Sequence, residues 1–187
     1  MKRFQKNDAG IAATEFALVM PVIIIIFLSV YELSFRFQLS DELERYAFQL
    51  SDITSRFDEL TDSDIKEFHD VSEYLLPSVD LKNGNISFIL VSIGYKKDHT
   101  PVLLWKRSAG SAKLDFDIKA AEGLAEPGQS VIVAVVRIQA NTLLSVFGDT
   151  KMTKTVISYS KPRTTRAIAI NGDLTDVGKE VTGYEHD

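Results

Sequence analysis

The feature that most constrains this chain is an uninterrupted apolar segment near its N-terminus. Residues 16–31 read FALVMPVIIIIFLSVY and contain no charged side chain. As an α-helix, the 21 residues from Ile11 to Tyr31 would span about 31 Å, the thickness of one hydrocarbon core. A core helix in so small a domain would have to bury residues 23–28 on every side. The segment therefore predicts one membrane-spanning helix at residues 11–31.

Charged residues before the apolar segment predict its orientation. Lys2, Arg3 and Lys6 form a basic leader that contains one acid, Asp8. Basic residues beside a membrane helix stay on the cytoplasmic side, so the N-terminus is expected inside and the later residues outside the cytoplasm. A cleavable secretory signal fits poorly, because the apolar run continues into residues 32–36 without a small-residue cleavage site.

Two helices are expected outside the membrane. Apolar residues at spacings of three and four predict an amphipathic helix that continues the membrane helix, since neither glycine nor proline lies between Tyr31 and Leu39. Its apolar positions are Leu39, Leu43, Tyr46, Ala47, Leu50, Ile53 and Phe57. A second helix begins at a capping box formed by Thr61 and Asp64 and ends before Pro77. Its inner face is expected to carry Ile65, Phe68, Val71, Ser72 and Leu75.

The rest of the chain predicts an antiparallel sheet. Segments rich in Val, Ile, Phe and Tyr alternate with turn-forming pieces, and they cover residues 86–95, 102–106, 130–141 and 152–160. Residues 131–136 are apolar at every position, which predicts a central strand covered on both faces. The pattern of residues 112–124 is compatible with more than one structure. The fold class is therefore α+β.

These elements predict five regions along the chain. They are a leader at 1–10, a transmembrane helix at 11–31, an amphipathic helix continuing the anchor at 32–60, an α+β head at 61–170 and a flexible acidic tail at 171–187. The tail is expected to be mobile because it is polar and carries five acids against one lysine.

Composition excludes several functions. A net charge of −5 and an absence of cysteine argue against nucleic-acid binding, disulfides and thiolate metal sites. The three histidines are far apart in sequence, and none belongs to a zinc-binding motif. Nucleophile-elbow and phosphate-loop patterns are absent as well. We therefore expect no catalytic, metal or cofactor site and no small-molecule substrate.

The junction between leader and helix carries the most informative motif. Gly10 is followed by Ile11, and Glu15 and Phe16 open the apolar run. This arrangement resembles a type IV prepilin cleavage region. The resemblance implies that a prepilin peptidase cuts between Gly10 and Ile11, which makes Glu15 the fifth residue of the mature chain. Glycine suits such a bond because it lets a protease approach an extended backbone closely.

A carboxylate inside a membrane helix is costly and normally has a specific partner. Cleavage would create one, since the new α-amino group of Ile11 would be largely protonated near neutral pH. Glu15 of the same or a neighbouring subunit could pair with this amine. We interpret Glu15 as a register mark for assembly on this basis.

The resemblance narrows further when the following residues are included. Residues 15–21 (EFALVMP) and 31–33 (YEL) resemble the start of the TadE and TadF pseudopilins of the tight-adherence (Tad, or Flp, type IVb) pilus system. The block at 41–51 (DELERYAFQLS) is more similar to TadF-like members. The resemblance implies a minor pilin in the bacterial inner membrane, with a periplasmic head that could enter the extracellular pilus. Its implied partners are the prepilin peptidase, the major Flp pilin, other pseudopilins and the inner-membrane assembly platform.

Two alternatives from other classes stay open at this point. The first is a signal-anchored periplasmic binding or sensor domain whose Gly10–Ile11 bond is never cut. The second is an anchored hydrolase, which would require a pocket with convergent polar groups.

Overall fold

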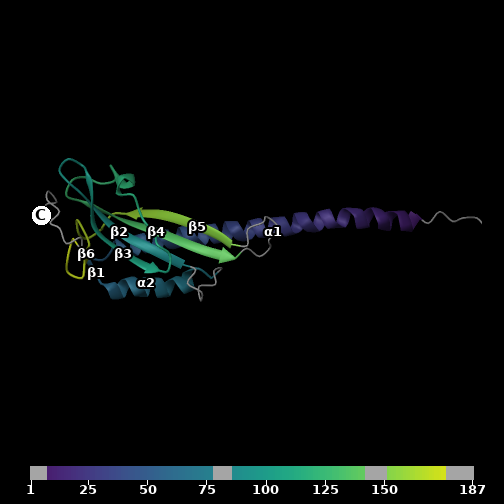
Figure 1. Cartoon of the computed structure of the whole chain (residues 1–187), viewed down its shortest axis with the longest axis horizontal. Coiled ribbons are helices and arrows are strands. Elements are labelled where there is room, and N and C mark those ends of the chain that lie inside the picture. Colours follow the sequence, from purple (N-terminus) through teal and green to yellow (C-terminus); the bar gives the residue numbers. More distant parts are fainter. Residues whose placement is uncertain (1–7, 78–85, 142–150, 176–187) are drawn as a thin grey trace, which may run out of the picture.

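The long N-terminal helix dominates the computed structural model, which describes residues 8–77, 86–141 and 151–175. Helix α1 (Asp8–Thr54) is one continuous rod of 47 residues, as the sequence predicts, and it includes Pro21. The head gathers around its C-terminal half, and the N-terminal half extends freely (Figure 1). The rod ends at Thr54 and not near residue 60 as predicted. Directly after Thr54, the Arg56 N–H donates to the Ile53 carbonyl in a tightened turn.

The buried stripe of α1 agrees largely with the predicted one. Its fully or almost fully buried members are Leu39, Leu43, Tyr46, Ala47 and Leu50. The prediction is wrong for Ile53, which is 42% exposed because the head covers only one side of the helix. Phe57 lies beyond the helix and packs edge-on against Phe68, with ring centroids 6.0 Å apart.

Helix α2 (Asp62–Leu75) starts at the predicted capping box. The Thr61 N–H donates to Asp64 Oδ2 at 2.7 Å, and the Asp64 N–H donates to Thr61 Oγ1 at 3.3 Å. Ile65 and Ser72 are buried as expected. The prediction is wrong for two positions, Val71 and Leu75, which are exposed. Leu76 is buried instead, because the chain leaves the helix there and turns this side chain inward.

The predicted antiparallel sheet is present and has the order β3-β2-β4-β5. Its strands are β2 (Ile86–Tyr95), β3 (Pro101–Gly110), β4 (Ser130–Asn141) and β5 (Lys151–Ser160). Strand β3 is longer than predicted. Its second half is polar and therefore lacks a strand pattern in the sequence, but pairing with β2 extends the strand to Gly110. A second, two-stranded parallel sheet joins β1 (Glu59–Leu60) to β6 (Ala169–Ile170). It was not predicted, since two-residue strands show no periodicity.

Both faces of the sheet are covered, and β2 and β4 form its centre. One face packs against α1 and α2 through Phe88, Leu90, Ile132, Ala134 and Val136. The other face presents Ile89, Val91, Val133 and Val135 to residues 111–129, which include the 3₁₀ helix η2 (Ile118–Ala121). The segment left open at residues 112–124 therefore covers the second face. This confirms the prediction of a central strand buried on both sides.

Candidate functional site

The residues of the processing motif lie together at the start of α1. Gly10 and Ile11 are in its first turns, and Glu15 and Phe16 follow one turn later. All four are exposed, and the helix carries them well away from the head (Figure 1). The basic leader residues Lys2, Arg3 and Lys6 lie outside the described residues.

Packing gives no reason for a glycine at position 10. A Cβ atom built there would meet nothing within 4 Å, and the backbone is that of an ordinary right-handed helix. Glycine lowers helix stability by about 1 kcal/mol relative to alanine. Within the described residues, the fold therefore gives Gly10 no packing role.

The apolar half of α1 is not used to build the core. Within the described residues, one helix is long and apolar enough to cross a membrane, and its most apolar window is entirely unburied. Its exposed large side chains are Ile11, Phe16, Leu18, Val19, Met20, Val22, Ile23, Ile24, Ile25, Ile26, Phe27 and Val30. A soluble protein would bury such a stripe. The helix therefore has the properties of an anchor rather than of a core element.

The head meets the helix at the end of the apolar run. Leu28 and Ser29 are half-buried, and Glu32 is the first fully buried residue of α1. Its carboxylate accepts a hydrogen bond from Arg36 Nε at 2.9 Å, one turn along the helix. The sequence interpretation missed this pair, although a glutamate four residues before an arginine at the end of an apolar run is a recognisable signal.

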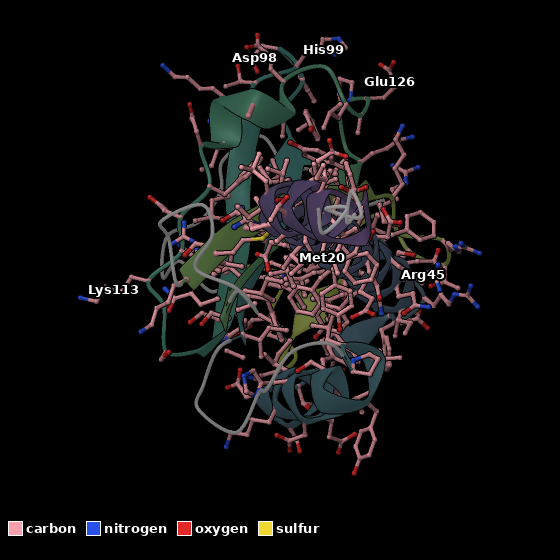
Figure 2. All side chains as sticks on the ribbon, turned by 90° about the vertical axis from the view of Figure 1, so that its right-hand side faces the viewer. Met20, Arg45, Asp98, His99, Lys113 and Glu126 are labelled. Atoms are coloured by element: carbon pink, nitrogen blue, oxygen red, sulfur yellow. The ribbon has the colours of Figure 1, made fainter. Side chains whose placement is uncertain are left out.

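The side of the head opposite α2 carries an open hollow lined mostly by polar residues. Viewed from the N-terminal side of α1, with Met20 in front, Asp98, His99 and Glu126 project from loops on the side opposite α2 (Figure 2). The hollow has a volume of about 930 Å³, with Asp98 and Asp115 in its lining. Hydrogen bonds lower the pKa of both carboxyls, from Thr100 to Asp98 and from Lys106 to Asp115.

Two carboxylates in the lining of the hollow already have hydrogen-bond partners. Asp98 and Asp115 are ionised acceptors already engaged by neighbouring groups, which is unlike a general acid or base. Among the described residues, no three His, Cys, Asp or Glu side chains are grouped to hold a metal ion. The structure therefore gives no support for the hydrolase alternative.

Fold and helix together define a class: an α+β head carried on a long, apolar N-terminal helix that fits membrane anchoring. Within that class, residues 10–49 match the family model described as TadE-like protein. The match covers the exposed apolar helix and most of its packed continuation, and it confirms the resemblance to TadE and TadF pseudopilins. It supports, in general terms, a minor pilin associated with Tad pili, a structural rather than an enzymatic family. No curated protein and no solved structure matched the chain in the same comparisons.

Proposed function

We propose that this chain is a minor pilin that a prepilin peptidase cuts between Gly10 and Ile11 before it takes part in assembling a Tad pilus used for adhesion. The observation that carries the proposal is the TadE-like match, which begins at Gly10 and follows the unburied helix. The head would lie in the periplasm, and the leader in the cytoplasm. The block at 41–51 favours TadF within this group.

The start of α1 suits cleavage. A protease needs an extended backbone, and opening the first turn between Asp8 and Ile11 sacrifices few hydrogen bonds because helix ends lack partners for their first N–H groups. Gly10 lowers the cost further. Its exposed surroundings leave room for an enzyme to approach.

Cleavage would also change the setting of Glu15. In the uncut chain this residue lies about two turns inside a helix that begins at Asp8. After cleavage the helix would begin at Ile11, and Glu15 would lie near unpaired N–H groups, the positive end of the helix dipole and the new amine. A neighbouring subunit could offer the same groups. Glu15 would then favour one depth of insertion into a bundle of such helices.

The test is the intact mass and N-terminal sequence of the full chain from cells with and without its cognate prepilin peptidase. We expect a new N-terminus at Ile11 in the presence of the enzyme, and at least a tenfold loss of this product for Gly10→Ala. Because a Cβ at position 10 meets no neighbour, Gly10→Ala retains the fold, so its loss of cleavage cannot be ascribed to misfolding. A companion variant, Glu15→Gln, should still be cut but should appear less in sheared pili.

The alternative function, an anchored binding or sensor domain, predicts no cleavage. An anchored binding or sensor domain would keep its original N-terminus whether or not the peptidase is present. Full-length protein in both strains would refute the minor-pilin proposal and support that alternative.

A further inference from the structure

The two edges of the four-stranded sheet are protected to different degrees. Strand β3 begins with Pro101, and its pairing with β2 contains a bulge. The Arg107 side chain extends from this edge to Asp62 of α2 at 2.7 Å and also donates to the Lys106 carbonyl at 3.1 Å. Proline, bulges and charged side chains are the usual means by which proteins block an edge strand.

Strand β5 forms the opposite edge. It has no proline and no bulge, and Lys151 and Lys154 are its only charged residues. It pairs with β4 over ten residues without a register shift, and in the described part of the chain β4 is its only strand neighbour. Backbone N–H and C=O groups of alternate residues therefore face outward along the strand. The side chains on its outer face, which include Thr153, Thr155, Ile157 and Tyr159, are exposed.

The surface beside β5 is apolar at its membrane-distal end and basic along its length. Ile157 is 46% exposed, and a hollow of about 170 Å³ next to it is lined by Leu124, Val131 and Tyr159. Lys151 is the first residue of the strand and Lys161 follows its last residue, and neither forms an ion pair within the described residues. An acidic, extended segment with aliphatic side chains would complement this surface.

Two copies of β5 are poor partners for each other. In Figure 1, β5 runs in the same direction as α1, away from the membrane end of the head. Copies anchored in one membrane have parallel α1 helices and hence parallel β5 strands, so an antiparallel β5–β5 pair is excluded. In a parallel pair, the lysines of the two strands would lie close together and repel each other.

The C-terminal segment of the chain has the required chemistry. Residues 176–187 (DVGKEVTGYEHD) carry four carboxylates against one lysine, with Val177, Val181 and Tyr184 between them. They follow Asn171, which exchanges hydrogen bonds with Asp62 at the membrane-distal end of the head. Twelve residues reach about 40 Å, which exceeds the length of about 33 Å of a ten-residue strand.

We propose that residues 176–187 of one copy add to the free edge of β5 of a neighbouring copy, as an antiparallel strand. With parallel anchors, the tail of one copy starts at the height where β5 of its neighbour ends. A tail running back toward the membrane is then antiparallel to that strand. The inference rests on the proposed function only in requiring that the copies share one membrane orientation.

Engineered disulfides can test this pairing cleanly because the natural chain has no cysteine. Two full-length versions with different tags are co-expressed, one with Thr155→Cys and the other with a single cysteine moved stepwise from Gly178 to Tyr184. Directly opposed residues of an antiparallel pair have Cα atoms about 4.5–5.5 Å apart, within the range of a disulfide. We expect a mixed dimer at one or two tail positions after mild oxidation in membranes.

The matched control places the cysteine at exposed Ser108 on the β3 edge, where the yield of mixed dimer should be at least tenfold lower. Charge reversal at Lys151 and Lys161 should reduce the β5 yield several-fold. Absence of a mixed dimer at every tail position would overturn the inference. So would a cross-link that forms only within one chain, when both cysteines are placed in the same copy.

N-terminal sequencing of the same membranes separates this inference from the proposed function. Cross-linked chains that keep an uncut leader would contradict the minor-pilin proposal and support the strand pairing. Cut chains without a cross-link would contradict the strand pairing alone.

Discussion

At the scale of single residues, Asp52 links the end of α1 to the C-terminal part of the head. Its carboxylate accepts a hydrogen bond from Arg56 Nη2 at 2.8 Å and pairs with the guanidinium of Arg163. The Arg163 N–H also donates to the Ser55 carbonyl at 2.9 Å. One carboxylate therefore joins two segments more than a hundred residues apart in sequence.

This bridge should show in the acid stability of the protein. The hydrogen bond from Arg56 and the charge of Arg163 lower the pKa of Asp52 below its usual range. A lowered folded-state pKa means that the stabilisation is complete above the unfolded pKa of about 3.9 and is lost as the pH falls through the folded value. We expect Asp52→Asn to melt at a lower temperature than the natural protein at pH 7, with the two melting temperatures converging below about pH 4.

Circular dichroism melts of the full chain in detergent between pH 3 and 7 would measure this effect. Asp41→Asn is the control, because Asp41 is exposed on the same helix and forms no ion pair among the described residues. A difference between Asp52→Asn and the natural protein that stays constant down to pH 3 would contradict the assignment.

At the scale of elements, α1 combines two helices with different tasks. The most apolar stretch of its N-terminal half is unburied within the described residues, and its C-terminal half forms the centre of the larger core with Leu39, Leu43 and Leu50. The helix keeps one exposed side even in the head, where Phe37 and Phe48 are more than 60% exposed. Apolar side chains on one helix therefore differ sharply in what they contribute to stability.

A matched pair of truncations on α1 would measure that difference. Leu43 is fully buried, so Leu43→Ala should lower the free energy of unfolding of the head by about 2–5 kcal/mol. Phe48 is 62% exposed, so Phe48→Ala should change it by less than about 0.5 kcal/mol. Denaturant titrations that follow the fluorescence of Trp105, the one tryptophan, would report both values. A large loss for Phe48→Ala would mean that this face is covered by another element.

At the scale of the whole molecule, the head is packed on the C-terminal half of α1, and the N-terminal half of the same helix is the apolar segment (Figure 1). Burial of Glu32 marks the point where the head begins, directly after Tyr31. If residues 11–31 cross the bilayer, the head rests close to the membrane surface without an intervening linker. The head's orientation then follows that of the anchor.

A charge in the middle of the apolar run should disturb membrane insertion while leaving the head intact. Ile24→Arg places an arginine near the bilayer centre, at a cost of about 2.5–3.5 kcal/mol on insertion scales. We expect a clear fall in the fraction of chains resistant to alkaline extraction of membranes. Phe37→Arg, at an exposed site on the same helix outside the run, is the control and should extract like the natural chain. Equal extraction of the two variants would refute residues 11–31 as the anchor.

Local chemistry was enough to predict much of this protein. The apolar run, the capping box at Thr61 and the strands at residues 86–95 and 130–141 depend on neighbouring residues only, and the structure contains each of them. The motif at Gly10 and Glu15 came from a family resemblance instead, and its role stays a prediction.

Only the tertiary structure decided what depends on residues distant in sequence. Ile53, Val71 and Leu75 have helical spacing yet are exposed, because the head covers one side of each helix. Residues 111–129 gained their role from the sheet face they cover, and β1 and β6 exist only as partners of each other. Periodicity tells which residues can share a face, but which face is buried is determined by the elements that pack against it.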